Sequence, residues 1–131
     1  MCSARNRPDF PDRKISETLI DFAQPFVAMI DERTTEEQVR HGFLLAVTVW
    51  NAVVFDAVDG NTKYLDMIWQ RLPSASEDDL LLRHLVDRKK RHFANDMRAI
   101  GKFTVTYEEG HLHVTAEARD PYSSKPGTTG P

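Results

Sequence analysis

Three side chains near position 90 have the chemical types and the spacing of an acid–base or ligand site. His92 and Asp96 stand four residues apart, and Lys89 precedes His92 by three, so a helix would bring all three alongside its apolar stripe. A carboxylate near an imidazole raises the pKa of the ring and fixes its orientation, which general bases and metal ligands both use. With His41 from an earlier helix, these residues form one hypothesis, a small-molecule, metal or catalytic site. The favoured alternative is a partly buried pair that stabilises the helix.

A basic run, Arg88-Lys-Lys-Arg91, gives a second hypothesis. Between Arg83 and Arg91, five positive residues oppose Asp87 alone, which is a local balance of +4. Contacts to phosphates need little more than such a stripe of positive charge, so the run could support weak nucleic-acid binding. The run nevertheless lies in the C-terminal half of an expected helix, where the helix dipole favours positive charge. A solvated basic face is therefore favoured over a nucleic-acid site. The residues of this hypothesis are Arg83, Arg88, Lys90, Arg91 and Arg98.

Two further groups of polar residues could hold a ligand. His41, Thr48 and Asn51 lie in an otherwise apolar segment, where polar side chains must find partners. They could line a small-molecule pocket, bond to neighbouring helices, or meet the same residues of a second copy. His111 and His113 alternate on an expected strand, so both rings point to one exposed side and supply half of a metal site.

The motifs of nucleotide, hydrolase and metal chemistry are missing from the sequence. It contains no glycine-rich phosphate loop, GxSxG turn, HExxH motif, EF-hand loop or CxxC pair. Cys2 is the only cysteine, so an internal disulfide and a cysteine-based metal site are both excluded. We therefore expect no catalytic set, no metal and no cofactor, and favour a protein that is not an enzyme.

Length and composition indicate one domain of ordinary size. The 131 residues are 40% hydrophobic and 28% charged, and the formal net charge is −3, which is close to the average of soluble proteins. Residues 1–14 lack the apolar core of a signal peptide. The longest uncharged apolar stretch, Gly42–Phe55, has fourteen residues, whereas a membrane span needs about twenty. We expect a cytoplasmic protein that does not enter a membrane.

Hydrophobic periodicity divides the chain into helices followed by a strand pair. Residues 1–14 are expected to form a flexible arm and residues 119–131 a disordered tail, around one domain at 15–118. The fold class is mainly α (α+β), a four-helix bundle-like core with a C-terminal antiparallel β-hairpin. The first expected helix is Ser16–Ile30, broken near Pro25, and the second begins at a Thr34/Glu37 capping box and ends at Val58. The other two expected helices are Thr62–Leu72 and Glu77–Ile100. The expected strands are Phe103–Tyr107 and Leu112–Ala116, joined by a turn around Glu109-Gly110.

The second expected helix is apolar around almost its whole circumference. A helix without a polar face is central to its fold or shared with a partner chain. A chain of 131 residues has few elements that could wrap it, so we expect a homodimer. The leading hypothesis is a non-catalytic interaction or regulatory module that acts as a homo-oligomer and can bind a protein partner. The apolar residues are Val39, Phe43, Leu44, Leu45, Val47, Val49, Trp50, Val53, Val54 and Phe55.

Three segments carry a resemblance: ISETLIDFAQP from Ile15, TVWNAVVFD from Thr48, and DRKKRHFANDMRAIGKFTVT from Asp87. Together they resemble a group of small bacterial helical proteins of unknown function, over Ile15–Ala118. The resemblance implies several helices followed by a short strand pair, in a bacterial and cytoplasmic protein. It implies no activity, cofactor or site residue.

Overall fold

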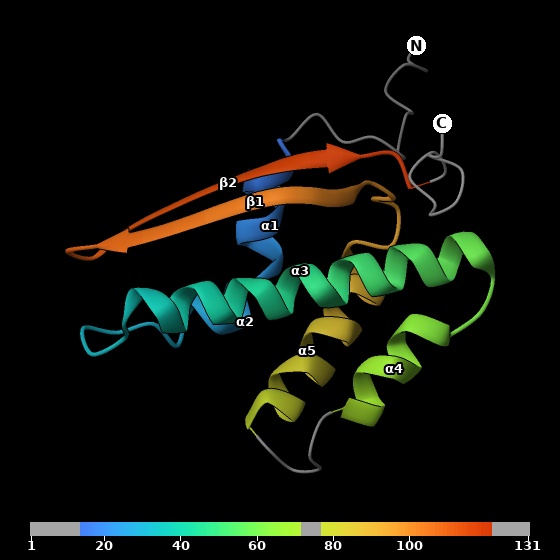
Figure 1. Ribbon diagram of the computed structural model, residues 1–131, viewed down its shortest axis with the longest axis horizontal. Coiled ribbons are helices and arrows are strands. Elements are labelled where there is room, and N and C mark those ends of the chain that lie inside the picture. The colour runs from blue at the N-terminus through green and yellow to red at the C-terminus, as the bar shows by residue number, and fades with distance from the viewer. Residues whose placement is uncertain (1–13, 72–76, 122–131) are drawn as a thin grey trace.

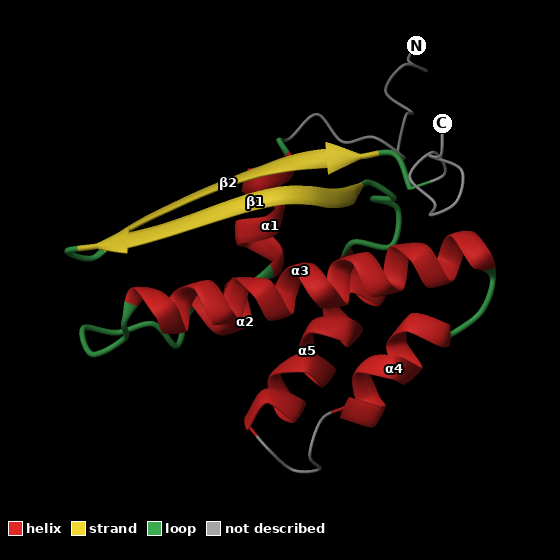
Figure 2. Ribbon diagram, viewed as in Figure 1, coloured by secondary structure: helices red, strands yellow, loops and turns green. Residues whose placement is uncertain are grey.

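Helices build most of the chain, and an antiparallel β-hairpin follows them (Figures 1 and 2). The computed structural model describes residues 14–71 and 77–121. Within these ranges the predicted mixture of helices and a C-terminal hairpin is confirmed, but there are five helices, and a four-helix bundle is not confirmed. The elements are α1 (Ile15–Phe22), α2 (Gln24–Val27), α3 (Glu36–Asp59), α4 (Lys63–Arg71), α5 (Glu77–His92), β1 (Ala99–Glu108) and β2 (His111–Arg119).

Helix α3 runs through the middle of the molecule, between the hairpin on one side and α4 with α5 on the other (Figure 1). Strand β1 packs along α3, and β2 packs on α1. A helix between two layers must be apolar toward both, so much of the apolar circumference of α3 is covered by its own chain. At the centre, the ring of Trp50 meets those of Phe22 and Phe93 edge to face, with centroids 5.2 and 5.8 Å away.

The start of α3 differs by one residue from the prediction. Thr35, and not Thr34, is the N-cap: its hydroxyl accepts the N–H of Gln38, and the Gln38 side chain accepts the N–H of Thr35. The Thr34 hydroxyl instead bonds to Asp31 in the preceding turn. Both threonines precede an acidic or amide residue at the right spacing, so the motif predicted a capping box without fixing its register.

Pro25 divides the first expected helix in two, as predicted. Helix α1 ends at Phe22, and α2 begins at Gln24, so Pro25 occupies the first turn of α2. Proline is tolerated there because the first helical N–H groups have no intrahelical acceptor. After Val27, the N–H groups of Met29 and Ile30 bond three residues back, so this end is a series of turns and not the continuous helix that was expected.

The prediction that the last helix reaches Ile100 is wrong, because α5 ends at His92. The ammonium of Lys89 donates to the carbonyl oxygens of Phe93 and Asp96, at 2.6 and 2.8 Å. These bonds hold the carbonyls of two residues just beyond the helix end, where helical N–H partners are no longer present. The chain then turns and enters β1, which the helical spacing of its apolar residues did not reveal.

Side chains of α3 bond to the backbone of β1 at both of its ends. The Asn51 amide donates to the Ile100 carbonyl at 2.9 Å and accepts the Ile100 N–H at 2.8 Å, as a neighbouring strand would. Near the other end, a Glu36 carboxylate oxygen accepts the Tyr107 N–H at 3.1 Å. Backbone groups at the edge of a sheet otherwise invite pairing with another chain, so α3 protects part of this edge.

The hairpin has the predicted register. Tyr107 pairs with Leu112, around a turn in which Glu109 and Gly110 have φ of 52° and 80°, the left-handed geometry of a tight type I′ turn. The strands are longer than predicted, with 10 and 9 residues. Pairing extends to Arg119, which was expected to begin the tail. Residues 122–131 of that tail and residues 1–13 of the expected arm lie outside the described residues.

Asp56 links the end of α3 to the start of α4. It is 5% exposed, and its carboxylate accepts the N–H groups of Tyr64 and Leu65 at 2.9 and 3.0 Å. We expect Asp56→Ala to lower the free energy of unfolding by about 2–3 kcal/mol, because one buried and one partly buried N–H donor at the N-terminus of α4 lose an anionic acceptor. Urea denaturation measures the effect. Asp66→Ala removes an exposed acid of α4 that accepts a hydrogen bond from the exposed Thr62 hydroxyl. It should cost less than about 1 kcal/mol, and equal losses for the two variants would contradict the role of Asp56.

Candidate functional site on helix α3

One face of α3 is not covered by the rest of the described chain. Positions 37, 41, 44 and 48 are exposed, and their spacing of four, three and four residues places them on one side of the helix. We call Glu37, His41, Leu44 and Thr48 the α3 strip. Leu44 is 48% exposed, and the strip contains no Lys or Arg. This spacing is typical of a helical seam that packs against another helix.

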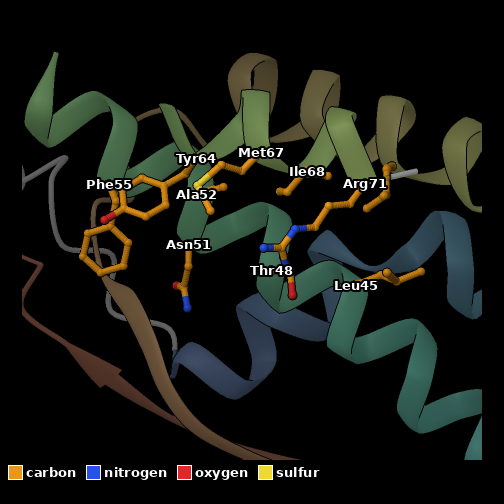
Figure 3. A pocket seen from close by; sticks show the side chains of 10 residues that line it. Leu45, Thr48, Asn51, Ala52, Phe55, Tyr64, Met67, Ile68 and Arg71 are labelled. Carbon is orange, nitrogen blue, oxygen red and sulfur yellow. The ribbon is translucent and has the colours of Figure 1, made fainter. Parts of the chain in front are cut away.

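A cavity of about 450 Å³ opens between α3 and α4, next to the strip (Figure 3). Its volume lies within the range of small-molecule sites. Phe55 and Tyr64 line one end, with ring centroids 5.9 Å apart. The other end is formed by Leu45, Thr48 and Arg71, whose guanidinium points toward α3 in Figure 3. The remaining lining residues are Asn51, Ala52, Met67, Ile68 and Leu82.

A second hollow, of about 380 Å³, lies on α3 toward its N-terminal end. Residues of α2 and of the turn after it form one wall, and Leu81 of α5 contributes to another. Leu45 lines both hollows, so they are neighbours along the helix. Of the predicted pocket residues, Thr48 and Asn51 therefore line the larger hollow, whereas His41 lines the smaller one.

Lys89 and Asp96 do come together, but in a closed junction and not in an open site. Lys89 is 1% exposed and Asp96 is 5% exposed. The Asp96 carboxylate accepts two bonds from the Arg98 guanidinium, at 2.9 and 2.6 Å. The Lys89 ammonium bonds to the Asp96 carbonyl and lies 4.1 Å from the centroid of the Trp50 ring. All buried polar side-chain atoms of the described residues have partners, so the junction is satisfied internally.

Burial lowers the pKa of Lys89 from 10.5 to about 8. Loss of solvation is the largest cause, because it disfavours the charged ammonium; nearby Asp96 raises the pKa, and Arg98 lowers it. None of the residues that line the two hollows belongs to this junction. The altered pKa is therefore a property of the core, and it is not the mark of a substrate site.

His92, Arg91 and His41 do not join the junction of Lys89 and Asp96. The helix ends at His92, so the expected four-residue helical spacing between His92 and Asp96 is absent, and His92 is exposed while Asp96 is buried. Arg91 is exposed and pairs with Asp87. His41 lies on the α3 strip. The structure thus does not bring the imidazole and the carboxylate into one acid–base site.

Comparisons with protein-family models, with curated proteins and with solved structures found no match to this chain. The resemblance to small bacterial helical proteins stays a prediction. The functional argument therefore rests on geometry.

Arg88 has a structural position, and the basic run does not form one continuous face. The Arg88 guanidinium donates to the carbonyl oxygens of Phe22 and Asp21, at 3.0 and 2.7 Å. These carbonyls belong to the last residues of α1, the negative end of that helix. Arg88 also forms an ion pair with the Asp21 side chain at 3.3 Å. It therefore fastens α5 to α1.

Acidic neighbours partly neutralise the other positive residues of the nucleic-acid-binding hypothesis. Arg83 pairs with Asp79 at 3.1 Å and lies over the ring of Trp69. The Arg98 guanidinium is held by Asp96, and Lys90 is exposed on the outer side of α5. A stripe for phosphates requires several cations on one surface, and these residues are divided between surface and core.

The histidines of the hairpin are exposed on β2. His111 pairs across the ladder with Glu108, and His113 pairs with Thr106. Among the described residues, no group of three or more histidine, cysteine, aspartate or glutamate side chains is arranged to hold a metal ion. The two imidazoles therefore remain half of a site, as their spacing indicated.

The residues contributed by α4 were missed by the search for chemical motifs. Tyr64, Met67, Ile68 and Arg71 form one wall of the larger cavity. Their signal was present as a short amphipathic helix, but periodicity alone does not distinguish a helix face that is buried from one that borders a hollow. Met67 is 40% exposed, which only the arrangement of α3 and α4 reveals.

Helix α3 is also long and apolar enough to cross a membrane, and it is the one such helix in the described ranges. Half of its most apolar window is buried inside the protein. Core helices of soluble proteins pass the same test of length and composition. The length and hydropathy of α3 are therefore compatible with a membrane span and with a buried core helix.

Proposed function

We propose that this protein is a cytoplasmic homodimer that works as an interaction or regulatory module, with the α3 strip at the centre of the interface. The observation that carries the proposal is the position of Leu44. This leucine is 48% exposed on a seam without Lys or Arg, and the neighbouring Leu45 lines both a largely apolar hollow and a mixed one.

Exposed apolar side chains and hollows lie next to each other around the strip. Leu44, Met29 and Met67 are exposed apolar side chains, and the latter two line the smaller and the larger hollow, respectively. A two-fold axis brings the same patch of both copies together, so exposed apolar side chains of one copy face the smaller hollow of the other. Apolar side chains of one helix that enter hollows beside another are the packing of paired helices.

The charge distribution favours a second copy of the chain over a charged partner. Glu37 lies at one end of the strip, and His41 is the other titratable group in it. When two α3 helices pack antiparallel, the two Glu37 carboxylates lie at opposite ends of the contact. Like charges are then separated, and the centre, at Leu44 and Thr48, remains uncharged.

Buried charges around α3 support a cytoplasmic protein over a membrane span. Asp56 is a buried residue of α3, and Trp50 packs against the Lys89 ammonium. Moving α3 into a bilayer would separate these groups from their partners and expose charge to hydrocarbon. The same contacts hold when α3 remains the core helix of a water-soluble dimer.

Leu44→Glu tests the proposal. We expect the parent protein to elute and scatter light as two chains at micromolar concentration, and the variant as one. A carboxylate at the centre of an apolar interface loses solvation without a counter-charge, so the dissociation constant should rise about thirtyfold or more. Size-exclusion chromatography with light scattering measures the mass, and circular dichroism should show unchanged helix content.

Leu80→Glu is the matched control. Leu80 is 66% exposed on α5 and lines neither hollow, so the same substitution there should leave the dimer intact. A parent protein that is monomeric at micromolar concentration would overturn the proposal. Equal dissociation of both variants would also overturn it, because the effect would then be general loss of surface hydrophobicity.

A further inference from the structure

The larger cavity has the chemistry of a ligand site, which goes beyond a contact between two copies. We infer that the space between α3 and α4 binds a small apolar molecule that carries one carboxylate group, such as an aliphatic monocarboxylate. Its inner wall is formed by side chains outside the α3 strip, among them Ala52, Phe55 and Ile68. Thr48 and Met67 also belong to the surface proposed for the dimer, but this inner wall does not, so variants of Leu44 and of Ala52 test the dimer and the ligand site separately.

The lining determines the apolar part of the ligand. Leu45, Ala52, Met67, Ile68 and Leu82 present hydrocarbon or thioether groups, and the rings of Phe55 and Tyr64 close one end (Figure 3). Sites of this volume that bind small molecules are typically apolar, with a few polar groups that fix orientation. An aliphatic chain fits such walls without leaving a polar group of its own unpaired.

Arg71 supplies the charge that selects a carboxylate. It is the one cation among the residues lining the cavity, and none of the lining residues is acidic. Among the side chains that the structure describes, which do not include those of residues 72–78, no ion pair joins an acid to Arg71. A guanidinium binds a carboxylate through two parallel hydrogen bonds. One cation above apolar walls suits a monoanion, and a cationic ligand would find no counter-charge.

The Asn51 amide and the Thr48 hydroxyl of the cavity already have partners within the protein, and Arg71 carries the one charge in the lining. The Asn51 amide both donates to and accepts from the backbone of Ile100. The Thr48 hydroxyl donates to the Leu44 carbonyl at 2.8 Å, so it offers a ligand an acceptor and no proton. In Figure 3 the Arg71 side chain extends over the cavity and its guanidinium lies close to Thr48. The carboxylate would then lie beside Arg71, and the chain would extend toward Phe55 and Tyr64.

Titration of the full-length protein with decanoate, below its micelle concentration, tests the inference. We expect saturable binding by calorimetry, with amide shifts in the spectrum of the isotope-labelled protein centred on Ala52 and Ile68. Decyltrimethylammonium, which has the same chain and the opposite charge, should bind at least about tenfold more weakly, since the cavity offers it no counter-charge. Absence of saturable decanoate binding would overturn the inference.

Two variants localise the site. Arg71→Gln should weaken decanoate binding about tenfold, through loss of a charge-assisted pair, and leave the affinity for decanol within about twofold. Ala52→Leu adds side-chain volume to the inner wall and should weaken both ligands about tenfold. Unchanged decanoate affinity in either folded variant would overturn the assignment. Leu44 does not line the cavity, so Leu44→Glu should bind decanoate as the parent does; loss of binding there would equally contradict the site.

Discussion

Replacing Asp96 with alanine should lower the free energy of unfolding by about 3–5 kcal/mol. The Asp96 carboxylate is buried and accepts two hydrogen bonds from Arg98, whose side chain is 14% exposed. The Lys89 ammonium, a second buried cation, bonds to the backbone carbonyl of the same residue. Alanine would leave both cations without this anion in a poorly solvated place. Urea denaturation at pH 7, followed by circular dichroism, measures the loss.

Asp87→Ala is the matched control for this prediction. Asp87 pairs with Arg91 on the surface, and the two side chains are 58% and 71% exposed. Exposed pairs on a helix contribute little, so this variant should change stability by less than about 1 kcal/mol. Similar losses for the two aspartates would show that the junction at Asp96 is no more important than a surface pair.

The same junction explains why the sequence predicted these residues as a site but could not predict their arrangement. The apolar positions from Phe93 to Ile100 fit a helical period, and only the bonds of Lys89 to carbonyls beyond the helix end show that the chain turns there. Such contacts depend on how Trp50 of α3 packs under the turn. Local periodicity does not contain this information.

Features set by neighbouring residues were predictable. The pairing of Tyr107 with Leu112 follows from alternation and from the short turn at Gly110. The break near Pro25 follows from the missing N–H of proline. Each depends on a few adjacent residues, whereas the larger cavity requires α3 and α4 to be placed side by side before Arg71 and Phe55 line one space.

The sequence correctly indicated that α3 is apolar around most of its circumference, but two different contacts account for this. The hairpin and α5 cover much of the helix, and this part needs no partner. What remains is the α3 strip, in which Leu44 is exposed. A homodimer is thus proposed from one strip of the helix, and not from its whole surface.

Lys89 should make the stability of the protein depend on pH in the alkaline range. Its pKa in the folded protein is about 8, below the value of 10.5 expected when the chain unfolds. Between these pH values the unfolded chain binds more protons than the folded one, so the free energy of unfolding gains from this group as pH rises. From pH 7 to pH 10 the gain is about 2 kcal/mol. The neutral amine keeps two N–H donors for the carbonyls of Phe93 and Asp96, so the junction does not lose its hydrogen bonds.

Lys89→Met separates this contribution from the titration of other groups. Methionine has a similar length and no charge, so the alkaline gain should disappear when the stabilities of parent and variant are compared at pH 7 and pH 10. At pH 7 the variant removes one of the two donors to the Phe93 carbonyl and the Lys89 donor to the Asp96 carbonyl, which costs stability. It also removes the unfavourable desolvation of a buried charge. Lys90→Met, on the exposed side of the same helix, should retain the parent's pH dependence. If Lys89→Met retained it as well, the ammonium would not be the group whose burial opposes folding at neutral pH.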